Sequence, residues 1–181
     1  LERKHNLNLF LKLIVKYIKK NKIKMPNKNE IVLHLRLGDV CVHEWFLSKN
    51  YVKLIRNIIK KNRKIKKITI ICCFAYQVFT DNSMHLRGKT ENLWDYTEYK
   101  QQKNIEKMKE ILEKIKRNFK HIRINIYSNK NVDLDLCYAV GARYFIKDNG
   151  GFSNLMNRLN LLNKKLFLKY RLVKNLARMY Y

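Results

Sequence analysis

Proline and glycine are scarce in this chain: one proline and five glycines stand among 181 residues. So few of the residues that interrupt helices and strands argue against a linker-rich or fibrous protein. Hydrophobic residues make up 46% of the sequence, which is enough for a substantial core and too many for a disordered chain. The length suits one domain, or one large half of a two-domain enzyme.

Acidic residues are also few: 14 Asp and Glu stand against 40 Lys and Arg, which gives a formal net charge of +26 at pH 7. Such a charge can neutralise nucleic-acid phosphates, but the codon usage of an AT-rich genome, which favours lysine, can also produce it. The lysines are spread over several of the expected helices, as at Lys12, Lys19, Lys53, Lys60, Lys107 and Lys114. We therefore expect mostly solvated faces, with nucleic acid the less favoured partner. A basic surface still attracts anionic lipid headgroups or nucleotide phosphates.

Long apolar runs are missing as well. No stretch reaches the roughly 18 uninterrupted apolar residues of a membrane-spanning helix. The apolar stretch from Leu9 to Ile18 is broken by Lys12 and Lys16, which indicates an amphipathic helix and not a signal sequence. We expect a cytoplasmic location on these grounds.

The sequence has no C-x-x-C pair. Its four cysteines are Cys41, Cys72, Cys73 and Cys137. The adjacent pair would point to opposite faces of a strand, and no spacing matches a zinc site. Buried free thiols and the absence of a bound metal are therefore the expectation.

Apolar residues alternate between strand-like and helix-like spacing along the chain. The expected strands are residues 30–37, 68–74, 122–127 and 144–146. The expected helices are residues 8–22, 50–62, 105–119, 132–140 and 151–162, followed by a basic amphipathic helix over 164–181. This alternation predicts an α/β fold, a Rossmann-like parallel sheet with helices on both faces.

The same pattern suggests three parts: an N-terminal helix and linker over 1–29, a Rossmann-like domain over 30–163, and a basic C-terminal helix over 164–181. Residues 76–102 are polar, aromatic and irregular, and so long a connection is a candidate functional loop. Asn131 is expected to cap the helix that follows it. Gly141 is expected to end that helix in the left-handed conformation.

Ligands of open parallel sheets bind beyond the carboxyl ends of the strands. Three expected strands end in polar or glycine-containing segments. These segments are Arg36, Gly38 and Asp39 after the first strand, Ser128 and Asn129 after the third, and residues 148–153 after the fourth. The sequence therefore predicts a binding site at this edge.

Two of these segments suit a phosphate. A guanidinium at the end of a buried strand, as at Arg36, is costly unless it meets an anion, and its fork geometry favours phosphate. Gly150 and Gly151 permit close backbone approach, and the N-terminus of the helix after them offers N–H groups. Together they predict a two-sided clamp for a diphosphate. The alternative is a salt bridge from Arg36 to Asp39 and an ordinary turn at the glycines.

Other titratable residues are given lesser roles. His34 is more readily explained as a hydrogen-bonded core residue than as a catalyst. Loop residues without ligand spacing are expected to be solvated. These are His43, Glu44, Asp81, His85 and Asp95.

The segment His34-Leu35-Arg36-Leu37-Gly38-Asp39 resembles the H-x-R-x-G-D motif of the α1,2-, α1,6- and protein O-fucosyltransferase superfamily. Later segments resemble further blocks of that family in the same order. They are residues 126–129, 133–137, 144–146 and 151–153. The resemblance covers roughly residues 30–159. Gly150-Gly151 depart from the family, which often has Asn-Ser or Ser-Ser there.

The resemblance implies a metal-independent glycosyltransferase of the GT-B type. It would transfer a sugar, usually fucose from GDP-fucose, to a glycan or protein acceptor. Residues 30–163 would be its C-terminal, donor-binding domain. The acceptor side, with any catalytic base, would be reduced, outside this chain or supplied by residues 76–102.

The resemblance also implies residue roles. Arg36 would contact the β-phosphate and stabilise the leaving group. Ser153 and the amides near Phe152 would hold the diphosphate, Phe152 would pack on the base or ribose, and Asp133 or Asn129 would read one of them. The remaining expected donor-site positions are His34, Gly38, Ser128 and Gly151. Asp39 and Glu44 are the nearest candidates for a base.

Two other functions stay open. One is a non-catalytic basic α/β module that binds nucleic acid or an anionic membrane. The other is a different anion-using α/β enzyme, against which the absence of a P-loop or cysteine-loop motif counts.

Overall fold

A computed structural model describes residues 2–37, 50–72, 78–79, 94–95, 98–128 and 131–179, and the side-chain environments of 6–37, 50–72, 102–127 and 131–166. The fold is built around a parallel four-stranded sheet in the order β5-β2-β1-β6. Its strands are β1 (Glu30–Leu35), β2 (Lys67–Cys72), β5 (Arg123–Ser128) and β6 (Tyr144–Ile146). The predicted α/β class with a Rossmann-like parallel sheet is confirmed.

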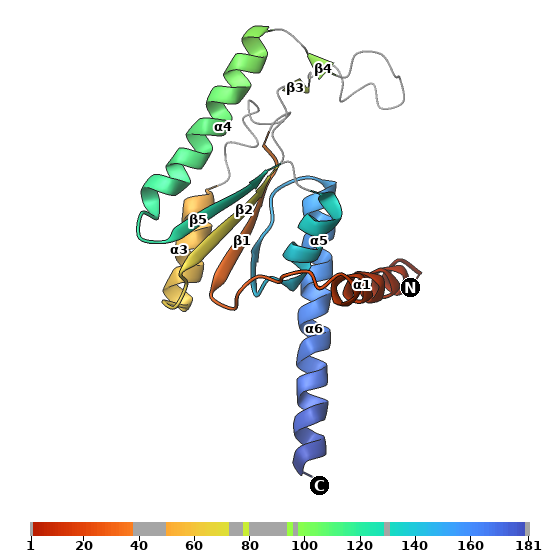
Figure 1. The fold of residues 1–181 in the computed structure, drawn as a ribbon. Helices are drawn as coiled ribbons and strands as arrows, with labels where there is room; N and C mark the ends of the chain where they lie inside the picture. The colour runs from red at the N-terminus through yellow and green to blue at the C-terminus, as the bar shows by residue number, and fades with distance from the viewer. Residues whose placement is uncertain are drawn as a thin grey trace.

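Helices cover both faces of this sheet (Figure 1). On one side lie α3 (Tyr51–Lys61) and α4 (Glu98–Asn118). On the other lie α1 (Glu2–Lys20), α5 (Val132–Gly141) and α6 (Gly151–Met179). A short antiparallel pair, β3 (Val78–Phe79) with β4 (Trp94–Asp95), is separate from the main sheet.

The strand sequences explain the two cores. Successive side chains of a strand point to opposite faces, so alternate residues of β1 enter different clusters. Leu33 packs with Ile55 of α3 and Ile115 of α4. Val32 packs with the other cluster, in which Leu11 of α1 and Leu159 of α6 are buried. A strand buried on both faces must be mostly apolar, and β1 and β2 are, with the buried polar residues His34 and Thr69 as exceptions within them.

Two helices differ from the expectation. Helix α4 begins at Glu98, although residues 98–102 were expected to belong to an irregular loop. Most of these residues intrinsically favour a helix, but they do not form the apolar stripe by which a helix is recognised in a sequence. Helix α6 continues from Gly151 to Met179, so the expected boundary at 163–164 falls inside one helix. No proline or glycine follows Gly151 to stop it.

The two ends of α5 show one correct and one wrong prediction. Asn131 caps the helix, because its Oδ1 accepts hydrogen bonds from the amides of Asp133 and Leu134 at 2.8 and 3.4 Å. Gly141 does not adopt the left-handed conformation; Gly150 is the glycine with positive φ in the described part of the chain. Gly141 is the last helical residue, and its missing side chain makes room for the methyl group of Met25.

The carboxyl end of α5 is instead capped from α6. Asn160 is buried, and its Nδ2 donates to the carbonyls of Ala139, Val140 and Ala142 at 2.9, 3.1 and 2.7 Å. These carbonyls lie at or just after the end of the helix, where no further helical turn supplies donors; the Ala139 carbonyl also accepts the Ala142 amide at 3.2 Å. The side chain of Asn160, from α6, therefore caps α5 at the end where Gly141 was expected to do so.

Among the helices in the described part of the chain, none combines the length and the apolar character needed to cross a bilayer.

Candidate anion-binding site at the carboxyl edge of the sheet

Some of the predicted site residues lie within the described structure and some do not. Gly38, Asp39 and Asn129 lie outside the described residues, as do His43 and Glu44. Ser128 is described through its backbone, as the last residue of β5. The side chains that the structure places are His34, Arg36, Asp133, Phe152 and Ser153, with Gly150 and Gly151 beside them.

Asp148, to which the sequence analysis gave no role, organises this edge. Its buried carboxylate accepts the Arg36 amide at Oδ2, at 2.8 Å. Its Oδ1 accepts the hydroxyl of Tyr51, the first residue of α3, at 2.6 Å, and the Asn149 amide at 2.7 Å. One carboxylate thus ties the end of β1 and the start of α3 to the loop between β6 and α6. The signal in the sequence was an acid two residues after a strand, but nothing local identifies Arg36 and Tyr51 as its donors.

The Arg36 guanidinium lies against Gly150, just before α6. A Cβ atom placed on Gly150 would be 3.1 Å from Nη1 and 3.5 Å from Cδ of Arg36. Gly150 also has a φ of +99°, in the region that favours glycine. The close approach of the Arg36 side chain to this backbone therefore requires glycine for two reasons, the lack of space for a Cβ atom and the positive φ.

The start of α6 supplies positive potential beside Arg36, next to the negative charge of the Asp148 carboxylate. Helix α6 starts at Gly151, and its first main-chain hydrogen bond in this turn runs from the Asn154 amide to the Gly150 carbonyl at 3.1 Å. The N–H groups of a first turn point away from the helix body, and the macrodipole adds positive potential there. The first turn contains no acidic residue. A guanidinium beside such a helix end suits a phosphate or diphosphate.

Ser153 has a structural contact at this edge. It is 1% exposed, and its Oγ accepts the Asp148 amide at 2.7 Å. The bond fixes the loop before α6. A direct contact of the Ser153 hydroxyl with a diphosphate stays a prediction; the backbone of this turn, with Gly151 exposed, is the more accessible part.

His34 and Phe152 pack on each other behind this loop. Their ring centroids are 5.7 Å apart and the planes meet at 75°, an edge-to-face arrangement. His34 is buried within β1, as expected for a core residue. The packing of Phe152 on a base or ribose stays a prediction, because the contact in the structure is to His34.

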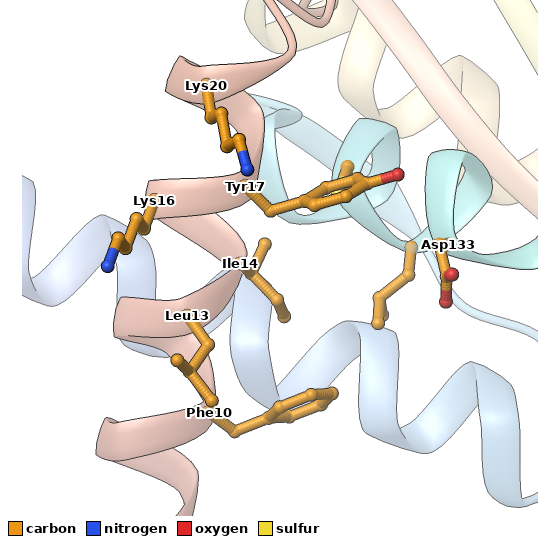
Figure 2. A pocket seen from close by; sticks show the side chains of 9 residues that line it. Phe10, Leu13, Ile14, Lys16, Tyr17, Lys20 and Asp133 are labelled. Carbon is orange, nitrogen blue, oxygen red and sulfur yellow. The ribbon is translucent and has the colours of Figure 1, made fainter.

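The remaining predicted positions lie farther along the sheet or on α5. Ser128 is level with Cys72, which is level with Leu35, so β2 separates Ser128 from β1. Two strand spacings correspond to about 10 Å. Asp133 lines a groove between α1 and α5 with Phe10 and Leu13 (Figure 2). No described contact joins Ser128 or Asp133 to Arg36.

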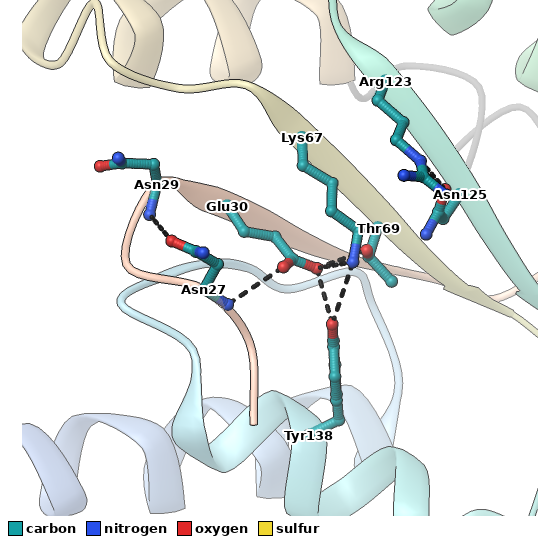
Figure 3. A network of polar contacts seen from close by, with 8 residues as sticks. All are labelled: Asn27, Asn29, Glu30, Lys67, Thr69, Arg123, Asn125 and Tyr138. Carbon is teal, nitrogen blue, oxygen red and sulfur yellow. Dashed lines mark hydrogen bonds and ion pairs between the residues drawn. The ribbon is translucent and has the colours of Figure 1, made fainter. Parts of the chain in front are cut away.

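A second polar cluster lies at the amino end of the sheet (Figure 3). Oε1 of the buried Glu30 accepts hydrogen bonds from Thr69 Oγ1 at 2.5 Å and Tyr138 Oη at 2.7 Å, and Lys67 Nζ lies 3.1 Å from it. Burial raises the pKa of Glu30, but the hydrogen bonds from Thr69, Tyr138, Asn27 and Lys67 outweigh it, so the pKa is lowered. Burial and the neighbouring Glu30 carboxylate raise the pKa of Tyr138. The cluster holds an ionised carboxylate in the core.

No group of three or more His, Cys, Asp or Glu side chains in the described segments is arranged to hold a metal ion. Cys72 and Cys137 are buried thiols, as expected, whereas Cys41 and Cys73 lie outside the described residues. Burial, with the nearby Asp133 carboxylate, raises the pKa of Cys137, so this thiol stays protonated at neutral pH.

Comparisons of the chain with family models, with curated proteins and with solved structures find no match.

Proposed function

We propose that the chain is a fucosyltransferase-like glycosyltransferase domain that binds a nucleoside-diphosphate sugar at the edge formed by Arg36 and the start of α6. The observation that carries the proposal is the position of the Arg36 guanidinium against Gly150. The H-x-R-x-G-D motif and this contact involve the same arginine, which the motif would assign to the leaving group.

The chemistry follows from the charges. An acceptor hydroxyl attacks the anomeric carbon, the bond from that carbon to the β-phosphate oxygen breaks, and its electron pair stays on the diphosphate. A fixed guanidinium and helix-terminal N–H groups stabilise the charge that develops there. The hydroxyl proton passes to a base, for which Asp39 is the candidate; it lies outside the described residues. Glu44, also outside them, is the second candidate.

Asp148 would be a positioning residue in this reaction. It accepts the Arg36 amide and holds the loop that carries Gly150, so it fixes the two parts of the clamp relative to each other. Small displacements of groups that stabilise developing charge are costly for a reaction rate.

The test is a thermal-shift and calorimetric titration with GDP, GDP-fucose, UDP and guanosine. We expect GDP and GDP-fucose to stabilise the protein and guanosine, which lacks the diphosphate, to have no effect. Loss of a charge-assisted bidentate contact in Arg36→Ala should weaken GDP binding by about 10- to 100-fold. Arg36→Lys should recover only part of the affinity, because an ammonium lacks the planar fork.

Arg158→Ala is the matched control. Arg158 is an exposed arginine on α6, and its removal changes the net charge as much as the removal of Arg36. Equal losses of GDP affinity in both variants would indicate general attraction to a basic surface and would contradict the assignment. Binding of DNA with a steep salt dependence and no nucleotide preference would favour the basic-module alternative.

A further inference from the structure

Helix α1 is apolar on two faces. Leu11 and Ile14 are buried in the core formed with α5 and α6. Four further large apolar side chains remain exposed: Leu9 (56%), Phe10 (37%), Leu13 (56%) and Tyr17 (42%). Leu9, Leu13 and Tyr17 are four residues apart and therefore follow one another along the outer side of the helix. We call these four residues the α1 stripe.

A groove runs beside the α1 stripe. It has a volume of about 360 Å³ and is formed between α1 and α5, with Ile14, Leu136 and Cys137 among its walls. Figure 2 shows Phe10, Leu13 and Tyr17 around this space, with Lys16 and Lys20 projecting from the same helix. The walls are mostly apolar, so the groove suits a hydrocarbon chain.

The charged residues of α1 that flank the α1 stripe are basic, and Asp133 of α5 is the acidic residue among those that line the groove. Every charged residue between Asn6 and Asn29 is a lysine. Lys12 and Lys16 are four residues apart and form an exposed row beside Leu9 and Leu13. A lysine can lay its aliphatic stem along apolar surface while its ammonium reaches an anion, which is the arrangement of helices that lie in a lipid interface.

We propose that the α1 stripe docks onto an anionic lipid surface, with Leu9 and Leu13 inserted among the acyl chains and the adjacent lysines on the headgroups. Charge complementarity favours a membrane over a compact acidic protein. The positive charge extends beyond α1 to exposed lysines on other helices, such as Lys60 and Lys61 of α3, which an extended anionic surface attracts at a distance. The inference is independent of the proposed transferase activity.

The experiment is co-sedimentation of the full chain with vesicles of phosphatidylcholine containing phosphatidylserine, compared with vesicles of phosphatidylcholine alone, at physiological salt. We expect binding to the anionic vesicles only. The double variant Leu9→Asn with Leu13→Asn should bind about tenfold more weakly, because it removes the inserted apolar groups and leaves every lysine. Leu161→Asn is its control, since Leu161 is 49% exposed on α6, outside the α1 stripe.

A lysine pair separates local docking from general attraction. Lys12→Gln with Lys16→Gln should weaken binding by about 30-fold, since each lysine at an anionic surface contributes about 1 kcal/mol. Lys60→Gln with Lys61→Gln changes the net charge equally on α3 and should have a much smaller effect. Circular dichroism and melting curves show that the variants are folded. Equal losses for both lysine pairs, binding unaffected by the leucine variant, or no binding to anionic vesicles would each overturn the proposal.

Discussion

The amide nitrogen of Arg36 lies 2.8 Å from Oδ2 of Asp148, although the two residues are 112 positions apart in the sequence. The hydrogen bond joins the motif arginine, which directly follows β1, to the loop that carries Gly150. The other carboxylate oxygen of Asp148, Oδ1, accepts a hydrogen bond from the Tyr51 hydroxyl. One buried carboxylate therefore determines how the two sides of the candidate anion site face each other.

Removing this carboxylate should destabilise the protein. Asp148→Ala leaves the Arg36 amide, the Tyr51 hydroxyl and the Asn149 amide without their acceptor in a buried place, and we expect a loss of about 3 kcal/mol in the free energy of unfolding. Tyr51→Phe removes one donor only and should cost about 1 kcal/mol. Urea unfolding at neutral pH measures both. A smaller loss for Asp148→Ala than for Tyr51→Phe would show that the carboxylate does not organise this edge.

The adjacent glycines should respond in opposite ways. Gly150→Ala forces a side chain into a positive φ and against the Arg36 guanidinium, so we expect a loss of stability of about 1–2 kcal/mol and weaker GDP binding. Gly151→Ala meets no atom within 4 Å and should be neutral or stabilise the helix by up to about 1 kcal/mol. Melting temperatures of the two variants test this, at about 2–4 °C per kcal/mol. Equal shifts in the same direction would refute the strained conformation of Gly150.

The ionised Glu30 carboxylate should contribute to the free energy of unfolding at neutral pH, and this contribution should be lost at acidic pH. Its pKa in the folded chain is below the ordinary value of 4.5, because the hydrogen bonds to its carboxylate outweigh the effect of burial. The contribution is therefore complete above that value and is lost as the pH falls through the lower folded-state pKa. Urea unfolding of the wild type and of Glu30→Gln between pH 7 and pH 3 should show a stability difference that shrinks on acidification. A difference independent of pH would contradict the lowered pKa.

The cap on α5 should depend on Asn160 more than on its neighbour Asn163. Asn160→Ala removes donors to three carbonyls in the core, and we expect a loss of about 2–3 kcal/mol. Asn163 is half-buried and donates to the Val140 carbonyl alone, so Asn163→Ala should cost about 1 kcal/mol or less. Thermal or urea unfolding ranks the two variants, and the reverse order would show that Asn160 is not the principal cap.

The sequence allowed the prediction of features that depend on near neighbours. The apolar residues of β1 and β2 indicated strands at these positions. Asn131 was recognisable as a cap because the amides that donate to it lie within three residues. The meeting of Arg36 with Gly150 followed from a topological rule, since parallel strands bring their carboxyl ends to one edge.

Features that join distant elements could not be predicted in this way. Nothing local to Asp148 indicates that Tyr51 is its donor, and nothing local to Gly141 indicates that Asn160 supplies the cap. The start of α4 was missed because residues 98–104 have no apolar stripe and pattern recognition depends on one. The partners of Asp148 and of the end of α5 are determined by the tertiary structure and not by the neighbouring residues in the sequence.

The pairing of β1 with β6 has a consequence for the order of assembly. The contact between Leu33 and Ile146 can form only after nearly all of the chain between them is available, whereas β1 can pair with β2 much earlier. Closing so long a loop carries an entropy cost that slows a folding step. The edge that holds Arg36 and Gly150 should therefore be completed late, so that a nascent or truncated chain lacking β6 has a partial sheet but no anion site.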